Sequence, residues 1–116
     1  MAVKPIPEGY RTVTPYLIVQ GAETLIEFLT QAFAATEIRR TLHLDGSIMN
    51  AEVKIGDSFI MLSEARPEFG AMPTMIHLYV ENADELYDRA LQAGATSMME
   101  PRDEFYGDRS AGVKDP

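Results

Sequence analysis

Residues 75–95 of the chain read MIHLYVENADELYDRALQAGA. Side chains of two kinds alternate over Met75–Val80, with isoleucine, leucine and valine on one face, and this predicts a β-strand. From Ala83 onward the apolar residues recur at i, i+3, i+4, i+7 and i+8. That spacing places them on one face of a helix, which we expect over residues 83–93.

Both ends of this helix carry recognisable signals. Asn82 can cap the first turn, and Glu85, three residues later, completes a pair of the capping-box kind. Gly94 supplies the left-handed residue with which many helices end. The segment therefore predicts a strand, a tight turn and a capped amphipathic helix.

The same pattern occurs earlier in the chain. Residues 16–34, YLIVQGAETLIEFLTQAFA, align without a gap with residues 77–95, an offset of 61. Seven aligned pairs are identical: Leu17/Leu78, Val19/Val80, Ala22/Ala83, Leu25/Leu86, Gln31/Gln92, Ala32/Ala93 and Ala34/Ala95. A fixed offset of this kind predicts two related halves. The alternative is that two amphipathic helices share leucine and alanine by chance.

The remaining segments extend each copy into a longer unit. Around the first copy we expect a strand over 12–19, a helix over 22–34 and strands over 36–44, 48–55 and 59–63. Asp45-Gly46 and Gly56-Asp57 suit two-residue hairpin turns. After a connector over 64–74, the second copy is followed by strands over 97–100 and 109–114, with a loop over 101–110.

These elements predict an α+β fold built from two βαβββ modules. The modules cover about residues 10–65 and 73–116, inside a single domain that spans 1–116. The second module has room for only two strands after its helix, so we expect it to lack its last strand.

The amino-acid composition excludes some kinds of partner and indicates the cellular compartment. The chain has no cysteine, which excludes disulfides and thiolate metal sites and fits a reducing cytoplasm. No apolar run approaches the roughly 18 residues of a membrane span, and the first residues lack the apolar core of a signal peptide. With a net charge of −8, the chain should repel nucleic acids and anionic membrane surfaces.

Five short motifs carry a resemblance to a known superfamily. They are Thr14–Leu17, Asn50–Glu52, Met61–Glu64, His77–Val80 and Phe105–Arg109. With the βαβββ repeat, they make the chain resemble the vicinal oxygen chelate superfamily of glyoxalase I, bleomycin-resistance proteins and extradiol dioxygenases, and most closely its PhnB-like branch. In relatives the FYGDR…GVKDP run continues into a final strand. The resemblance therefore implies a shortened form or natural fragment, whose sheet is left open or completed by a partner.

The resemblance also implies where metal ligands would lie. Transferred by repeat position, three of the four ligand positions fall on Thr14, Met61 and Met75. Neither threonine nor methionine suits the hard or borderline divalent ions of glyoxalases. Many PhnB-like relatives have a histidine where this chain has Asn50. We therefore expect no metal and no cofactor.

Candidate ligand-binding residues lie on the expected strand faces opposite the helices and in the aromatic loop. They are Tyr16, Asn50, Glu52, Met61, His77, Tyr79, Tyr106 and Arg109. An aromatic, apolar wall of this kind suits flat organic ligands, and Arg109 could recognise an anionic group. The alternatives are a structural role for His77, a solvated carboxylate at Glu52 and a salt bridge from Arg109 to Asp103, Glu104 or Asp108.

The sequence thus favours a protein of unknown specific function that binds a small organic ligand in a concave cavity without a metal. One alternative is a metal-dependent lyase, isomerase or dioxygenase of the vicinal oxygen chelate type. Another is a fragment whose function belongs to a longer form. Because the short second module exposes a sheet edge, we also expect a homodimer.

Overall fold

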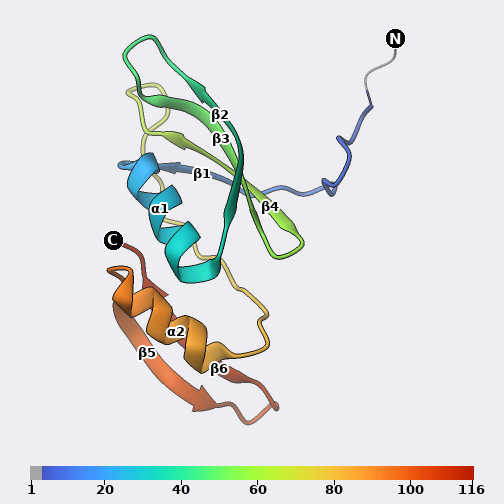
Figure 1. The fold of residues 1–116 in the computed structure, drawn as a ribbon, viewed down its shortest axis with the longest axis vertical. Coiled ribbons are helices and arrows are strands. Elements are labelled where there is room, and N and C mark those ends of the chain that lie inside the picture. The colour runs from blue at the N-terminus through green and yellow to red at the C-terminus, as the bar shows by residue number, and fades with distance from the viewer. Residues whose placement is uncertain (1–3) are drawn as a thin grey trace. The chain divides into compact units, whose positions relative to one another are not determined.

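The computed structural model describes residues 4–116 (Figure 1). Its elements are β1 (Tyr16–Val19), α1 (Ala22–Phe33), β2 (Thr36–Leu42), β3 (Ile48–Ile55), β4 (Ser58–Glu64), α2 (Ala83–Gln92), β5 (Thr96–Asp103) and β6 (Arg109–Lys114). The chain divides into two compact units. The first unit comprises residues up to 22 and residues 36–73, and the second comprises residues 23–35 and 74–116. The predicted α+β class and the order of elements in the first βαβββ module are confirmed.

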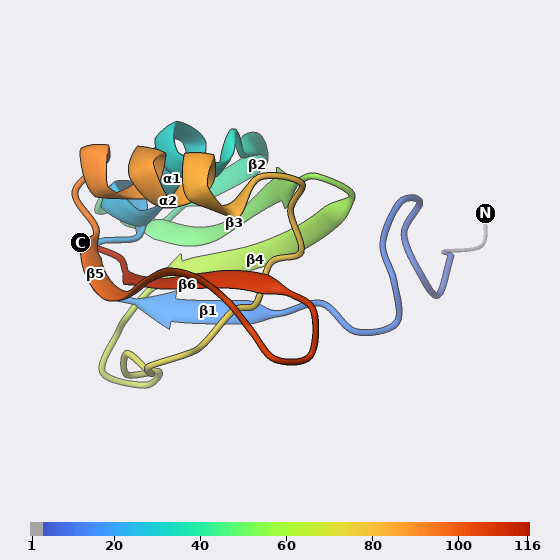
Figure 2. The same ribbon diagram turned by 90° about the horizontal axis from the view of Figure 1, so that it is seen from below.

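The first unit is built on a four-stranded sheet with strand order β1-β4-β3-β2 (Figure 2). β1 runs parallel to β4, whereas β3 is antiparallel to both of its neighbours. Leu62 lies opposite Leu17 on one side and Ala51 on the other. All three are buried, as are Val53 and Ile60 on the same face. This face forms the apolar core of the first unit.

β1 is shorter than the strand predicted over 12–19. Proline has no amide hydrogen to donate to a ladder, so the strand begins just after Pro15, whose carbonyl oxygen accepts from the Met61 amide at 2.9 Å. β1 also forms the edge of its sheet, the position expected for a strand next to proline.

Of the two predicted two-residue hairpin turns, one is confirmed and the other is wrong. Ile55 pairs directly with Ser58, so Gly56-Asp57 is the expected two-residue turn. The Asp45-Gly46 prediction is wrong, because β2 ends at Leu42 and the amide of Gly46 bonds to the carbonyl of His43 at 3.0 Å. Only Gly46 of that pair has a positive φ, 89°, which suits a longer loop with a left-handed glycine.

The start of α1 is capped by a residue from a distant strand. The Glu64 carboxylate, at the end of β4, accepts hydrogen bonds from the amides of Gly21 and Ala22, each at 2.9 Å. These amides have no partner within the helix, and a carboxylate is favoured at a helix N-terminus. Glu64 therefore ties β4 to the first residue of α1.

α2 has both ends that the sequence predicts. The Asn82 side chain accepts from the Glu85 amide at 3.0 Å, which confirms the N-cap. At the other end the Gly94 amide bonds to the Leu91 carbonyl and the Ala95 amide to the Ala90 carbonyl. With Gly94 at φ 108°, these two bonds form a Schellman motif.

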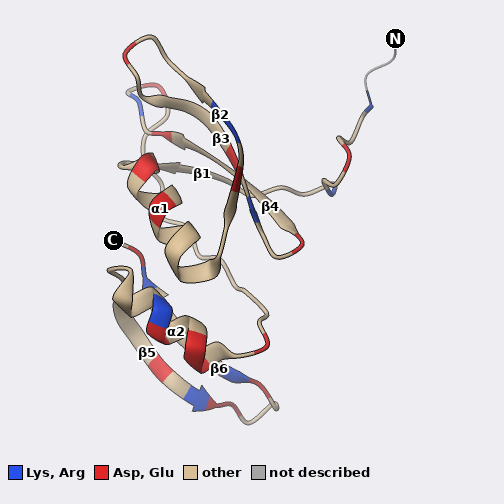
Figure 3. Ribbon diagram, in the orientation of Figure 1, with Lys and Arg blue, Asp and Glu red and all other residues tan. Residues whose placement is uncertain are grey.

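The second unit pairs β5 with β6 in an antiparallel hairpin, and α2 packs against both strands. Basic and acidic residues are interspersed along this hairpin (Figure 3). The strand predicted over Met75–Val80 is not formed, because none of its residues has a ladder partner among residues 4–116. A strand is stable only when its backbone groups are paired, whatever its side-chain pattern. No helix in the described chain is long and apolar enough to cross a membrane.

Candidate functional site

Four of the predicted ligand-binding residues meet on one face of the first unit's sheet. Tyr16 lies opposite Met61, and Met61 lies opposite Glu52, so the three form one row across β1, β4 and β3. Asn50 lies on the same face and its Nδ2 donates to the Tyr16 hydroxyl at 3.3 Å. This surface, called the Glu52 face below, is opposite the apolar core of the unit.

Glu52 is the buried charged residue at the centre of this face. Glu52 is only 8% exposed, so its carboxylate is not the solvated group that the alternative describes. The Tyr10 hydroxyl donates a hydrogen bond to Glu52 Oε1, and Arg39 Nε lies 3.5 Å from Oε2. A buried carboxylate is costly unless such partners satisfy it. The Glu52 face therefore presents a buried hydrogen-bond acceptor whose oxygens face the Tyr10 hydroxyl and the Arg39 guanidinium.

Tyr10 is a site residue that the sequence analysis missed. Its ring stacks on Phe59 of β4, with centroids 4.1 Å apart and planes inclined by 21°. Lys54 Nζ lies 5.5 Å from the centroid of the Phe59 ring. Gly9 has a φ of 87°, and a Cβ there would come within 3.2 Å of Phe59, so glycine lets the chain approach closely. Nothing in the proline-rich lead-in marks Tyr10 except that it is aromatic.

The environment of Tyr10 predicts an unusual titration. Burial, followed by the hydrogen bond to Glu52, raises the pKa of Tyr10 to about 12. Spectrophotometric titration should thus show one of the five tyrosines ionising near pH 12, and Tyr10→Phe should remove that step. In Glu52→Gln the pKa of Tyr10 should fall towards 10.

The same shift has a consequence for stability. The unfolded chain releases this proton near pH 10 and the folded chain near pH 12, so the contribution of Tyr10 to the free energy of unfolding is present below pH 10. It is lost as the pH rises through 12. Five tyrosines that all ionise near pH 10 would contradict the contact between Tyr10 and Glu52.

The residues at the implied metal positions do not fit a divalent ion. Met61 lies beside Glu52 in the cross-strand row, and Met75 is 92% exposed. Thioether and hydroxyl side chains are poor ligands for hard or borderline ions. Within residues 4–116 no three histidine, cysteine, aspartate or glutamate side chains lie close enough together to hold a metal.

The other four predicted residues lie in the second unit. His77, Tyr79 and Arg109 line a groove of about 480 Å³, which also has residues of α2 and β6 in its walls. The rings of His77 and Tyr79 meet edge to face with centroids 4.8 Å apart. Tyr106 does not line this groove; it is 60% exposed and packs edge to face against Phe105.

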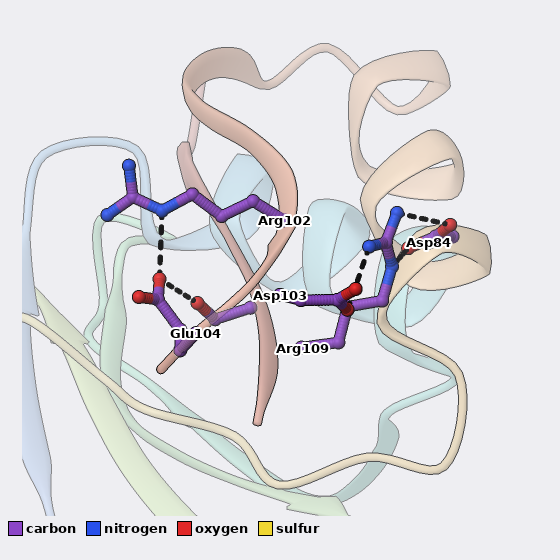
Figure 4. Close-up of polar contacts among 6 residues, drawn as sticks. Asp84, Arg102, Asp103, Glu104 and Arg109 are labelled. Atoms are coloured by element: carbon purple, nitrogen blue, oxygen red, sulfur yellow. Dashed lines mark hydrogen bonds and ion pairs between the residues drawn. The ribbon is translucent and has the colours of Figure 1, made fainter. Parts of the chain in front are cut away.

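Arg109 is engaged by two carboxylates (Figure 4). Its Nε and Nη2 bond to the two oxygens of Asp84 at 2.7 and 3.2 Å, and its Nη1 bonds to Asp103 Oδ1 at 3.1 Å. The bonds to Asp84 and then Asp103 raise the pKa of Arg109, and those from Arg109 lower the pKa of Asp84. Asp103 was among the predicted partners, whereas Asp84, 25 residues away in sequence, was not.

Comparison with known proteins agrees with this fold. An uncharacterized protein of Mycobacterium bovis is 34% identical over 115 residues, covering 90% of this chain and 76% of the relative. The fold is shared with the PhnB protein of Bacillus cereus, at 16% identity and a TM-score of 0.65, covering 90% of this chain and 92% of the other. It is also shared with the fosfomycin resistance protein FosX of Mesorhizobium loti, at 19% identity and a TM-score of 0.65, covering 90% and 82%.

The family itself is shown by a match over most of the sequence. The model of the Glyoxalase/Bleomycin resistance protein/Dioxygenase superfamily matches residues 11–116, which include the whole Glu52 face and the groove of the second unit. The chain therefore belongs to the glyoxalase/bleomycin resistance protein/dioxygenase superfamily.

Proposed function

We propose that the chain binds a small organic ligand, without a metal, on the Glu52 face. The observation that carries this proposal is the buried Glu52 carboxylate, which already holds an aromatic hydroxyl, that of Tyr10. Tyr16, Asn50 and Met61 provide further polar and apolar surface on the same face. Sites for small molecules commonly combine apolar walls with a few well-placed polar groups.

The contacts of Tyr10 suggest the chemistry of the ligand. Its phenol ring lies flat on Phe59 while its hydroxyl donates to Glu52. A ligand with a planar ring and a hydrogen-bond donor would make the same two contacts after displacing Tyr10. We therefore propose that the segment around Tyr10 covers the site and that an aromatic ligand with a hydroxyl or amino group replaces it.

Calorimetric titration with p-cresol, the side chain of tyrosine as a free molecule, tests this proposal. Tyr10→Ala should bind p-cresol with a Kd of about 1 mM, the affinity of a small ligand with about eight heavy atoms. The unaltered chain should bind it more weakly, because Tyr10 competes. The double variant Tyr10→Ala, Glu52→Gln should lose most of the binding, whereas Tyr10→Ala, Glu68→Gln should not, since Glu68 is exposed. Equal binding by all four proteins would contradict the proposal.

The alternative is a metal-dependent lyase, isomerase or dioxygenase. Elemental analysis of the purified protein separates the two functions, because our proposal expects no stoichiometric metal. About one equivalent of zinc, nickel, manganese or iron per chain would favour the enzyme. His77, Tyr79, Tyr106 and Arg109 remain predicted ligand contacts, and Arg109 would have to exchange Asp84 or Asp103 for an anionic group.

Two finer assignments belong to the same proposal. We place the chain in the PhnB-like branch, supported by its motifs and by the likeness to the B. cereus protein. We also propose a cytoplasmic location, supported by the absence of cysteine from the sequence. A location outside the cytoplasm, found by fractionating cells, would contradict the second assignment.

A homodimer is the last part of the proposal. Tyr79, Phe105 and Tyr106 are 86%, 99% and 60% exposed, and exposed aromatic surface of this kind is often covered by a second copy. Sedimentation equilibrium at micromolar concentration should give twice the 12.9 kDa of one chain. Tyr79→Asp should weaken the dimer, and Lys54→Asp should do less. A clean monomer mass for the unaltered chain would contradict this assignment.

A further inference from the structure

The contacts of Tyr10 also show how a ligand in its place would be oriented. The hydroxyl bonds to Glu52, whereas the ring stacks on Phe59, which lies two residues from Met61, the β4 partner of Glu52. A Cβ on Gly9 would lie 3.2 Å from the Phe59 ring, so the backbone next to Tyr10 also lies beside that ring. The ring position para to the hydroxyl therefore points away from Glu52 and towards Phe59.

Lys54 lies in the same row as Phe59. It is the cross-strand partner of Phe59 and lies two residues after Glu52, on the same face of β3. Two residues along a strand span roughly 6.6 Å, so the Lys54 side chain starts well beyond Glu52 in the direction of the para position. Its Nζ lies 5.5 Å from the centroid of the Phe59 ring, the surface on which the ligand would stack. A group attached at the para position would thus come within reach of the ammonium.

The ammonium of Lys54 is available to a ligand. Lys54 is exposed and has no ion-pair partner among residues 4–116, whereas Arg39, opposite Glu52 on β2, already lies 3.5 Å from the Glu52 carboxylate. The chain as a whole carries a net charge of −8. At physiological salt, however, exposed charges more than about 8 Å apart are largely screened from each other. An acidic group at the para position would therefore be attracted by the nearby ammonium despite the charge of the whole chain.

We propose that Lys54 determines which aromatic ligands the Glu52 face prefers, by pairing with an acidic group at the end of the ring opposite the hydroxyl. This inference rests on the function proposed above, in which the ligand replaces Tyr10. On binding, Lys54 exchanges its contact with the Phe59 ring for an ion pair. The preferred ligand then has a hydrogen-bond donor for Glu52 at one end and an anion for Lys54 at the other.

Two related phenols test this inference. p-Ethylphenol is neutral, whereas p-hydroxyphenylpropionate has a carboxylate at the end of the same two-carbon chain. Calorimetric titration of the Tyr10→Ala chain should give a Kd about threefold lower for the acid, the gain expected of an exposed ion pair. Raising the salt concentration should remove this preference without weakening the binding of p-ethylphenol, because only the acid depends on a charge.

Substitutions of Lys54 in the same Tyr10→Ala background separate its charge from the rest of the face. Lys54→Met has an unbranched side chain without the charge, so the two phenols should bind equally. Lys54→Glu should reverse the preference and make the acid about threefold weaker than the neutral phenol. Lys114→Met removes an exposed lysine from β6 in the second unit and is the matched control, which should keep the preference for the acid.

The neutral phenol distinguishes failure of this inference from failure of the proposed function. Binding of p-ethylphenol with no preference for the acid would overturn the role of Lys54 and leave the proposed function standing. A preference that Lys54→Met leaves unchanged would do the same. Failure of both phenols to bind the Tyr10→Ala chain would contradict the proposed function, and this inference with it. Because Lys54 is exposed, its variants should fold, which circular dichroism checks.

Discussion

Replacing Leu62 with alanine is expected to lower the free energy of unfolding by about 2–5 kcal/mol. Leu62 is completely buried, at the centre of β4, and lies between Leu17 and Ala51 in the core of the first unit. Removing its side chain leaves a cavity among strands that are held in place by their ladders. Urea denaturation followed by circular dichroism measures the change.

Leu44→Ala is the matched control for this measurement. Leu44 lies in the loop after β2 and its side chain is fully exposed, so the same substitution should change the free energy of unfolding by less than about 0.5 kcal/mol. A loss below about 1 kcal/mol for Leu62→Ala would mean that the sheet register of the first unit is wrong.

Glu64→Ala is expected to cost about 1–2 kcal/mol of stability. The carboxylate accepts from the amides of Gly21 and Ala22, and its removal leaves both without this partner. Glu64→Gln keeps an acceptor oxygen but loses the charge that favours the helix N-terminus, so it should cost about half as much.

The control for this capping effect is Glu68→Ala. Glu68 Oε2 lies 3.8 Å from Arg66 Nε in an exposed ion pair, and the loss of this pair should change stability by at most about 0.5 kcal/mol. Equal effects of the alanine substitutions at Glu64 and Glu68 would contradict the cap.

The sequence predicted much of this fold because many helix and turn signals lie within a few residues of the structure that they specify. Asn82 and Gly94 fix the ends of α2 through bonds to residues at most five positions away. The strand predicted over residues 75–80 is wrong because strand formation depends on a distant partner. Their alternation is that of a strand, but pairing depends on a distant segment, which for β1 is β4. Side-chain pattern alone does not reveal whether such a partner is present.

In the candidate site, too, features within one strand were predicted from the sequence, whereas a contact between distant segments was not. The alternation of side chains along β3 correctly predicted that Asn50 and Glu52 lie on one face. The 61-residue internal repeat pointed to Tyr16, which aligns with His77. The contact of Tyr10 with Glu52 spans 42 positions in the sequence and joins a segment without periodicity to a strand. This contact depends on the stacking of the Tyr10 ring on Phe59, and no short sequence motif predicts that stacking.

We propose that the Glu52 face binds a planar ligand with a hydrogen-bond donor in the place of Tyr10. The most direct measurement is a ¹H–¹⁵N spectrum of the Tyr10→Ala chain titrated with p-cresol. We predict shifts concentrated at the amides of Tyr16, Asn50, Glu52 and Met61, with saturation. Shifts confined to the groove of the second unit, or no saturable shifts at all, would contradict the claim.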